Sequence, residues 1–495
     1  MKAQLSYFLA SVYPKLLWLA LAAWVALLPI ALGRLRRLLA ATKPRTGALF
    51  SVMLLVALAL RLAAGPAHRV YDDEFEHLDI AHHLAVSATF SETLVGGMAG
   101  YDVRARPTWP GGHHAALAVV FKLFGGTAYA AFAWSALLSV LSALFVFWAA
   151  LELFEDERGA LAAAFAWAVL PLLVQYARAS DLTSSTVFWC AAALAALHSR
   201  EKEPGPGLDM FTAITVAFAV QVRPENVLLL GYALLLRVPA KILLPGLLGA
   251  AVPAGIALAN HADALPGYSA ATTAPFSHLT RQFLPNLRYL ASRAEFWPLL
   301  LPAAFAAFTR RPAARLAALS AAYFLLYGCF FRGRFDNGTE DRYALTAVLP
   351  LAVAAAAALP PAAVPAALLA AGFAWNATPA PAAEHEASRR FLERSTRLIP
   401  QHAYVAAFNP PFVREVAGRP VVWAFLLLED LPAFERERAR VGAAPELVLY
   451  KDWAWRSRPA EAARLESKLA AGYASSPLAD NGLDSLVLLT PRAKR

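Results

Sequence analysis

Hydrophobic positions form long runs along most of the chain, from residue 16 to about residue 376. Residues 16–33 and 48–65 contain one arginine between them, and each run approaches the roughly 20 residues that cross a hydrocarbon core. The first run is too long, and too soon followed by a second, to fit a cleaved signal peptide. The pattern therefore predicts an α-helical polytopic membrane protein with about twelve spanning helices. The expected spans are 16–33, 47–64, 129–151, 159–177, 182–198, 209–222, 224–237, 242–260, 295–309, 313–331, 343–359 and 362–376.

The pattern changes near residue 377, where charged residues become frequent and short alternating runs appear. Strand-like runs at 403–408, 420–425, 446–451 and 485–490 alternate with helical patterns at 384–398 and 459–471. This alternation predicts a small α/β domain outside the membrane. Two domains are expected: a transmembrane domain over residues 1–376, which includes a long polar loop at 66–128, and the α/β domain over residues 377–495.

Composition and charge support a membrane protein rather than a nucleic-acid-binding one. Hydrophobic residues make up 59% of the chain and charged residues 16%, whereas soluble domains carry about a quarter charged residues. The net charge of +10 comes largely from Lys and Arg in short loops, which is typical of cytoplasmic loops and not of a basic stripe. If the loop at 34–45 is cytoplasmic, the basic loops near Arg200, Arg237 and Arg310 share its side. The regions 66–128, 175–183, 261–294 and 332–342 and the C-terminal domain then lie on the outer side, most simply of the plasma (inner) membrane.

The most polar stretch of the first outer loop reads VYDDEFEHLDIAHHLA, residues 70–85. From Glu74 onward the spacing of apolar residues predicts an amphipathic helix along the membrane interface. Asp73 and Glu74 stand where this helix begins. Neighbouring carboxylates repel each other, and at a low-dielectric boundary this repulsion is expected to raise the pKa of at least one of them. A carboxylate in such a place can act as a general base toward a hydroxyl group. The plainer alternative is that these charges only solvate the helix.

Arginines recur in the other outer segments. Arg106 precedes a proline in the first loop, Arg178 and Asp181 share one turn, and Arg342 follows a charged turn. Arginine suits bidentate contact with a phosphate group. Each arginine alone is explained equally well by snorkelling or by pairing with a nearby carboxylate, but their gathering on one face favours a site.

The order of these features resembles the GT-C superfamily of membrane glycosyltransferases, specifically the protein O-mannosyltransferase and lipid A aminoarabinose-transferase-like group. The resemblance covers about residues 47 to 360. Its motifs are Asp73-Glu74 before an interfacial helix, Arg106-Pro107 before a short helix ending in FKLFG (121–125), Asp181 in an outer turn, and Arg342-Tyr343 before a Leu/Pro-rich helix. The chain departs from the family in three places: arginine replaces a common lysine, TWPGGHH (108–114) replaces an aromatic-rich continuation, and the helix at 16–33 is extra.

The resemblance implies an inverting glycosyltransferase that moves a sugar from a polyprenyl-phosphate donor to a hydroxyl group of a lipid, glycan or protein. Asp73 would accept the proton of the attacking hydroxyl, and Glu74 and Asp181 would orient the acceptor or the base. Arg106, with Arg178 or Arg342, would hold the leaving phosphate. The expected substrate-binding residues are Arg106, Arg178, Arg342, Tyr343, Trp109 and His77.

No cofactor is predicted. The chain has no P-loop or Rossmann glycine pattern that would bind a nucleotide sugar. Asp79 and His83 have helical i, i+4 spacing, but there is no His-Glu-x-x-His motif, and Cys190 and Cys329 lie in apolar segments. These features favour a site without a metal, and a divalent-metal site stays the alternative. The alternatives from other classes are a lipid or sugar transporter or flippase, and a scaffold that presents the outer domain; a ligase with a lipid-diphosphate donor would use the same loop chemistry.

Overall fold

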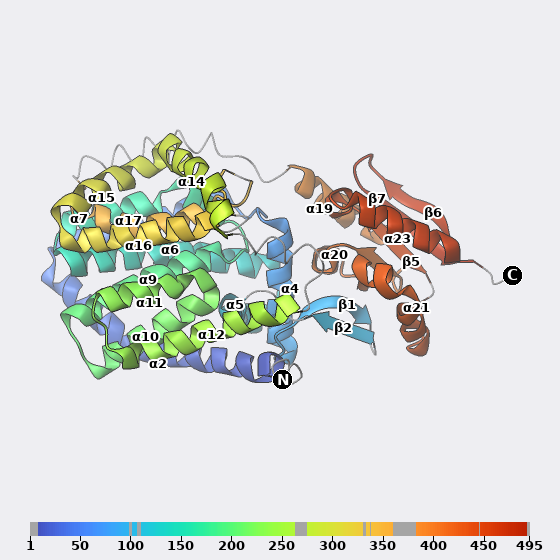
Figure 1. Cartoon of the computed structure of the whole chain (residues 1–495), viewed down its shortest axis with the longest axis horizontal. Helices are drawn as coiled ribbons and strands as arrows, with labels where there is room; N and C mark the ends of the chain where they lie inside the picture. The colour runs from blue at the N-terminus through green and yellow to red at the C-terminus, as the bar shows by residue number, and fades with distance from the viewer. Residues whose placement is uncertain are drawn as a thin grey trace. The chain divides into compact units, whose positions relative to one another are not determined.

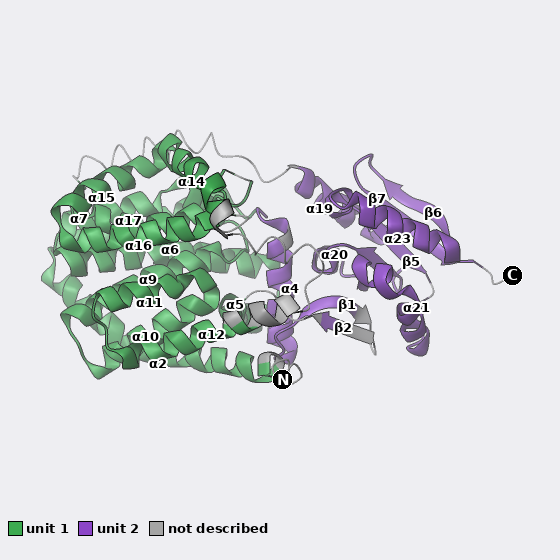
Figure 2. Ribbon diagram, viewed as in Figure 1, with its two compact units in different colours: residues 1–67, 108–378 green, residues 68–107, 379–495 purple. Residues whose placement is uncertain are grey.

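A computed structural model of the chain describes residues 8–98, 101–105, 110–262, 275–329, 333–336, 338–359, 383–444 and 446–492. The chain forms two compact units (Figure 1 and Figure 2), and each is described by itself. Unit 1 comprises Met1–Ala67 and Thr108–Thr378, and unit 2 comprises His68–Pro107 and Pro379–Arg495. The sequence analysis assigned the whole loop 66–128 to the transmembrane domain, whereas residues 68–107 group with the C-terminal part because their strands join its sheet.

Unit 1 is built from helices. They are η1 (Phe8–Val12), α2 (Tyr13–Ala41), α3 (Pro44–Ala64), α5 (Gly112–Phe124), α6 (Ala128–Phe154), α7 (Glu157–Ala168), α8 (Pro171–Tyr176), α9 (Thr183–Lys202), α10 (Pro206–Val222), η2 (Pro224–Val227), α11 (Leu228–Leu235), α12 (Ala240–Ala262), α14 (Pro275–Ser292), η3 (Ala294–Phe296), α15 (Trp297–Thr309), α16 (Arg311–Cys329) and α17 (Arg342–Ala355). By length and composition, α2, α3 and α6 can each cross a membrane, and several shorter helices are also apolar. The count of twelve spans stays a prediction, and the expected span at 362–376 lies outside the described residues.

Two helices differ from the expected pattern. The span predicted at 159–177 is interrupted, because α7 ends at Ala168 and α8 begins at Pro171. Proline lacks an N–H group and disfavours a helical conformation in the residue before it, so one helix must stop and another begin. The second difference is α14, a helix in a region that the sequence analysis treated only as a polar outer segment.

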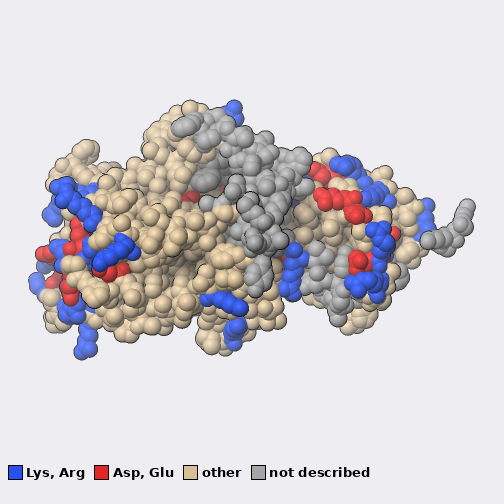
Figure 3. All heavy atoms as spheres, turned by 60° about the horizontal axis from the view of Figure 1, so that its bottom comes forward, with Lys and Arg blue, Asp and Glu red and all other residues tan. Residues whose placement is uncertain are grey.

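Ion pairs connect several loops at one end of unit 1. Arg34 at the end of α2 lies 2.7 Å from Glu152 of α6, whose side chain is only 1% exposed. Glu152 also accepts a hydrogen bond from the Ser199 hydroxyl of α9, at 2.7 Å. Lys202 lies 2.6 Å from Glu155. Figure 3 shows basic and acidic side chains gathered at the left end of this unit, while its flank is largely uncharged. Of the basic loops predicted to share the cytoplasmic side, 34–45 and the loop near Arg200 thus meet at this end, and the side of the membrane that this end faces stays a prediction.

Unit 2 contains a seven-stranded mixed sheet with the order β2-β1-β4-β3-β5-β7-β6. Only β3, β4 and β5 pair in parallel. The strands are β1 (Glu92–Met98), β2 (Tyr101–Ala105), β3 (Tyr404–Ala407), β4 (Val421–Trp423), β5 (Leu447–Lys451), β6 (Tyr473–Asp480) and β7 (Ser485–Pro491). The helices are α4 (Tyr71–Ser87), α19 (Ala383–Ser395), η4 (Thr396–Leu398), α20 (Pro410–Ala417), α21 (Ala424–Arg440), α22 (Trp453–Arg456) and α23 (Pro459–Gly472).

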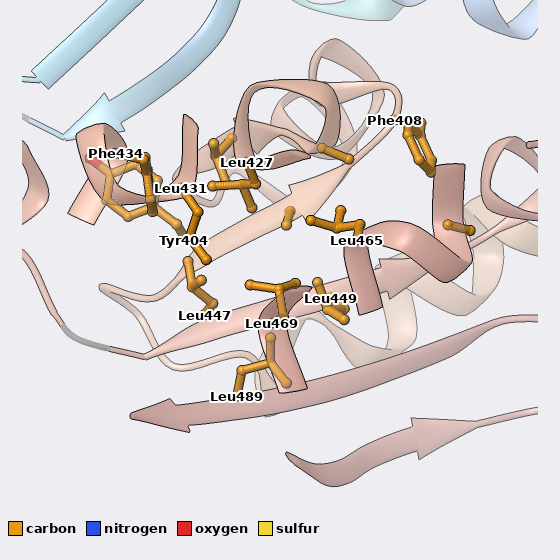
Figure 4. Packing of buried hydrophobic residues seen from close by; sticks show 14 of the residues in the cluster. Tyr404, Phe408, Leu427, Leu431, Phe434, Leu447, Leu449, Leu465, Leu469 and Leu489 are labelled. Atoms are coloured by element: carbon orange, nitrogen blue, oxygen red, sulfur yellow. The ribbon is translucent and has the colours of Figure 1, made fainter. Parts of the chain in front are cut away.

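The core of unit 2 joins segments that are far apart in the sequence. Val95 of β1 pairs with Val422 of β4 in antiparallel register, and both side chains are fully buried. Figure 4 shows Tyr404, Leu465 and Leu489, from β3, α23 and β7, packed in the same apolar cluster. The first loop therefore supplies two strands and part of the core to a domain whose remaining strands come from the C-terminal region.

We expect Gly159→Ala to destabilise unit 1. A Cβ atom at Gly159 of α7 would lie 2.1 Å from the carbonyl oxygen of Ala356, just after α17, so the two helices would have to separate. Overpacking of this kind costs about 1–3 kcal/mol, and the thermal midpoint of the full chain in detergent should fall. Gly231→Ala in α11 is the control, because nothing lies within 4 Å of its added methyl group. Equal midpoints for the two variants would contradict the close packing of α7 and α17.

Candidate functional site

Glu74 uses both carboxylate oxygens to hold the segment that leads into α4. Its Oε1 accepts hydrogen bonds from the backbone N–H groups of Arg69, at 2.6 Å, and Val70, at 2.8 Å. Its Oε2 lies 2.9 Å from Nδ1 of His68, and the side chain is fully buried. Backbone N–H groups at a helix start have no partner within the helix, so an acidic side chain here satisfies them. Glu74 therefore fixes the conformation from which α4 begins.

Asp73 occupies a different environment, although it is the neighbouring residue. Successive side chains of a helix point about 100° apart, and the Asp73 side chain is partly exposed whereas Glu74 is buried. A carboxylate in the first turn also interacts favourably with the positive end of the helix dipole. Of the two adjacent acids, Asp73 is thus the more accessible one.

Farther along α4, Asp79 connects this helix to two other elements of unit 2. It accepts hydrogen bonds from the backbone N–H of Thr93, at 2.7 Å, and from its hydroxyl, at 3.0 Å. The Arg414 guanidinium of α20 donates to Asp79 Oδ1 at 2.8 Å. Burial raises the pKa of Asp79, while the nearby His83 and Arg414 and the Thr93 N–H group oppose this shift. The buried carboxylate thereby ties α4 to β1 and to α20.

Two further polar contacts join α4 to the C-terminal part of unit 2. The Tyr71 hydroxyl donates to Glu386 Oε2 of α19 at 2.6 Å, and His82 Nδ1 lies 2.7 Å from Glu415 Oε1 of α20. Hydrogen bonds from the Arg389 guanidinium and the Tyr71 hydroxyl, against the effect of partial burial, lower the pKa of Glu386 to about 2. Much of the polar character of residues 71–83 therefore serves packing within unit 2.

The possible metal ligands on α4 have other partners. The described residues contain no group of three or more His, Cys, Asp or Glu side chains that could hold a metal ion. His83 Nε2 lies 3.7 Å from Asp79 Oδ1 and 2.7 Å from the Thr93 hydroxyl. His77, expected to bind substrate, is fully buried on the same helix.

In unit 1, several helix ends bring charged groups together. Arg342 begins α17, and its Nη1 lies 3.8 Å from Asp181 Oδ2 in the turn before α9. The guanidinium carbons of Arg223 and Arg342 lie 4.9 Å and 5.4 Å from the centre of the Tyr343 ring. Cation–π contacts of this type contribute about 0.5–2 kcal/mol each. Arg223, Arg342, Tyr343 and Asp181 are called the arginine–tyrosine cluster below.

The cations of this cluster are buried, with exposures of 4% for Arg223 and 3% for Arg342. Asp181 is fully buried and accepts a hydrogen bond from the Thr183 hydroxyl. Nε of Arg223 has no hydrogen-bond partner among the described residues. Arg342 also lies 3.6 Å from Glu340 Oε2, and Glu225 interacts electrostatically with Arg223. Because Nε of Arg223 still lacks an acceptor, the cluster is suited to hold an additional anion.

Arg178 lies in the same region of the sequence as Asp181 but binds a different element. Its Nε donates to the carbonyl oxygen of Gly65, at 2.7 Å, and its own carbonyl oxygen accepts from the N–H of Ala67, at 3.1 Å. Gly65 caps the C-terminal end of α3, where a cation is favourable for the helix dipole. Arg178 thus fixes the end of α3.

The structure divides the expected site residues between the two units. Asp73, Glu74 and His77 lie in unit 2, whereas Asp181, Arg178, Arg342 and Tyr343 lie in unit 1. It brings Arg342, Tyr343 and Asp181 together. Arg106 and Trp109 lie outside the described residues. The set omitted Arg223, although its charge at the end of an apolar run was a usable signal.

We expect Arg414→Ala to loosen α4. Removal of this guanidinium leaves the Asp79 carboxylate buried without the arginine that pairs with it. Breaking a fully buried ion pair costs about 3–5 kcal/mol. The cost is smaller here because the Arg414 side chain is 31% exposed. Hydrogen exchange of the full chain should become faster in α4 and β1. Arg390→Ala is the control, since the Arg390 side chain is 62% exposed. Unchanged protection of α4 in Arg414→Ala would show that the pair does not hold the helix.

A family model described as dolichyl-phosphate-mannose-protein mannosyltransferase matches residues 110–254. These residues run from just before α5 into α12 and include Asp181 and Arg223. A search of curated proteins finds no match to the chain.

Solved structures with a similar fold include ArnT from Cupriavidus metallidurans in the apo state, at 14% identity and a TM-score of 0.59, covering 90% of this chain and 98% of that one. The same protein bound to undecaprenyl phosphate has 13% identity and a TM-score of 0.58, with coverages of 90% and 97%. AglB from Archaeoglobus fulgidus, in complex with an inhibitory peptide and a dolichol-phosphate, has 12% identity and a TM-score of 0.51, with coverages of 90% and 74%.

At these identities the likeness establishes the fold. It extends over nine tenths of the chain, while the family model adds a sequence match within unit 1. The resemblance that the sequence predicts is therefore confirmed at the level of the fold, which the chain shares with ArnT and AglB, and by the family-model match over residues 110–254.

Proposed function

We propose that the chain is an inverting glycosyltransferase that moves a sugar from a polyprenyl-phosphate donor to an acceptor hydroxyl group on the outer face of the plasma (inner) membrane. The acceptor is a lipid, a glycan or a protein. The observation that carries the proposal is the arginine–tyrosine cluster, in which two buried guanidinium groups face one tyrosine ring. Solved proteins of this fold include one bound to undecaprenyl phosphate and one in complex with a dolichol-phosphate.

The cluster has the chemistry that a leaving phosphate requires. As the bond from the sugar to the phosphate oxygen breaks, negative charge grows on that oxygen, and donors fixed in a dry site stabilise this charge best. Arg342 already has Asp181 and Glu340 nearby, and Glu225 interacts electrostatically with Arg223, but Nε of Arg223 has no partner among the described residues. A phosphate would supply this missing acceptor.

Asp73 is proposed as the general base. It accepts the proton of the acceptor hydroxyl while the hydroxyl oxygen forms a bond to the anomeric carbon. The carbon–oxygen bond to the phosphate breaks on the opposite face of the sugar, so the configuration inverts and the polyprenyl phosphate leaves. Glu74 positions the start of α4, and Asp181 orients the guanidinium of Arg342. Arg106, Trp109, His77 and Arg178 stay predicted substrate-binding residues.

Asp73→Asn should abolish most of the turnover, because general base catalysis contributes about 10²- to 10⁴-fold. Membranes containing the full chain would be incubated with a panel of labelled undecaprenyl-phosphate-linked hexoses and pentoses, and labelled acceptor would be measured. The carboxylate-to-amide change Glu429→Gln, at an exposed position of α21, is the control. Near-wild-type transfer by a folded Asp73→Asn protein would remove Asp73 from this role. Movement of labelled lipid across the bilayer without product would favour a transporter.

Arg223→Ala and Arg342→Ala should each lower kcat/KM by about 100- to 1,000-fold, the usual loss for a donor that stabilises transition-state charge. The lysine variants should recover only part of the rate, because an ammonium group cannot reproduce the planar pair of donors. Arg45→Ala, at an exposed position near the start of α3, is the matched control. If both alanine variants transfer sugar at the wild-type rate, the cluster does not bind the leaving group.

A further inference from the structure

Helix α14 buries two amides together with Tyr289 and Leu290 and leaves other apolar side chains exposed. Gln282 and Asn286 are buried, with exposures of 5% and 0%, whereas Phe283, Leu284 and Leu287 are 42%, 50% and 47% exposed. A helix with buried amides and an exposed apolar sector suits a position beside lipid rather than in water. This arrangement also explains why α14 looked like a polar loop in the sequence.

Two arginines stand beside the apolar sector. Arg281 and Arg288 are both exposed and lie seven residues apart, about two helical turns or ~10 Å along one face. Leu284 lies between them on that face, at i+3 from Arg281 and i−4 from Arg288. Within the described part of the chain, neither arginine forms an ion pair or a hydrogen bond. The exposed face of α14 thus combines lipid-facing side chains with two cations that are available to an anion.

The inner face of α14 is fixed to the segment that leads into the arginine–tyrosine cluster. Asn286 Nδ2 donates to the carbonyl oxygen of Gly333 at 2.8 Å, and its Oδ1 accepts from the N–H of Phe335 at 2.8 Å. A Cβ at Gly333 would lie 1.6 Å from the carbonyl oxygen of Tyr327, so only glycine fits there. These contacts connect α14 to residues 333–336, which shortly precede Arg342 at the start of α17.

We propose that α14 is a loading surface for the lipid donor, at which Arg281 and Arg288 bind the phosphate headgroup of a polyprenyl phosphate before sugar transfer. The inference rests on the proposed function and adds a second phosphate contact to it. Charge complementarity selects the phosphate, since both guanidinium groups are exposed. The neighbouring Phe283, Leu284 and Leu287 suit the isoprenoid chain, which enters sideways from the bilayer.

Binding of undecaprenyl phosphate without a sugar tests the proposal directly. The full chain would be placed in nanodiscs of phosphatidylcholine, and binding would be followed by hydrogen exchange of α14 and by native mass spectrometry. One basic residue near a membrane surface contributes about fivefold to the binding of an anionic lipid. R281Q/R288Q should therefore weaken binding by about 10- to 30-fold. R310Q/R311Q, at two exposed arginines where α15 ends and α16 begins, should bind the probe as the wild type does.

Transfer assays give an independent readout. R281Q/R288Q should raise KM for the donor by the same factor and leave kcat unchanged, because a loading contact is not part of the transition state. Unchanged binding in R281Q/R288Q would overturn the proposal. So would phosphatidylglycerol that competes as well as the probe at equal mole fraction, since α14 would then bind any anionic lipid. A different outcome bears on the proposed function. If the probe binds through α14 but the chain transfers no sugar, the proposed function is contradicted and the lipid-binding role of α14 is not.

Discussion

A charged side chain that leaves water needs a partner of opposite charge, and this constraint shapes both units. The partly buried pair Arg34–Glu152 joins loops at one end of unit 1, and the pair Asp79–Arg414 holds α4 within unit 2. In each pair the carboxylate also accepts a hydrogen bond from a neighbouring group, so most of its hydrogen-bonding capacity is used. The arginine–tyrosine cluster is less complete. Arg342 lies close to both Asp181 and Glu340, and Glu225 interacts electrostatically with Arg223, yet Nε of Arg223 has no hydrogen-bond partner among the described residues. A buried guanidinium N–H group without an acceptor is therefore the strongest chemical sign of an anion site.

The same constraint explains the dense polar stretch on α4. Its acids and imidazoles are distributed around the helix, and Asp79, His82 and His83 have specific partners in β1 or α20. Glu74 is turned inward to hold the start of the helix, which leaves the neighbouring Asp73 on the more open side. One sequence motif thus supplies both a structural carboxylate and a candidate base, and the two roles follow from the 100° step between adjacent helical residues.

Sequence reasoning was strongest where a signal is local. Long apolar runs marked most of the helices, and four alternating runs in the tail correspond to β3, β4, β5 and β7. The pairing of β1 with β4 carried no local signal, because β1 contains Gly96 and Gly97 and its partner is more than 300 residues away. The role of Glu74 could not be predicted because it depends on backbone groups. Helix α14 was not predicted because it buries amides and exposes apolar side chains, so its sequence looks like that of a polar loop. The nearness of Arg342 to Asp181 was anticipated only through the order of motifs.

The discontinuous sheet imposes an order of events during synthesis. Val95 leaves the ribosome more than 300 residues before Val422, its partner in β4. At about 5–20 residues per second, the β1–β2 hairpin waits roughly 15 to 60 s with one edge unpaired. Exposed strand edges readily recruit foreign strands, so the nascent chain has a vulnerable interval whose length is set by the intervening helical sequence. Rapid insertion of that sequence into the bilayer would shorten this interval, and a chaperone that shields the hairpin would protect the chain during it.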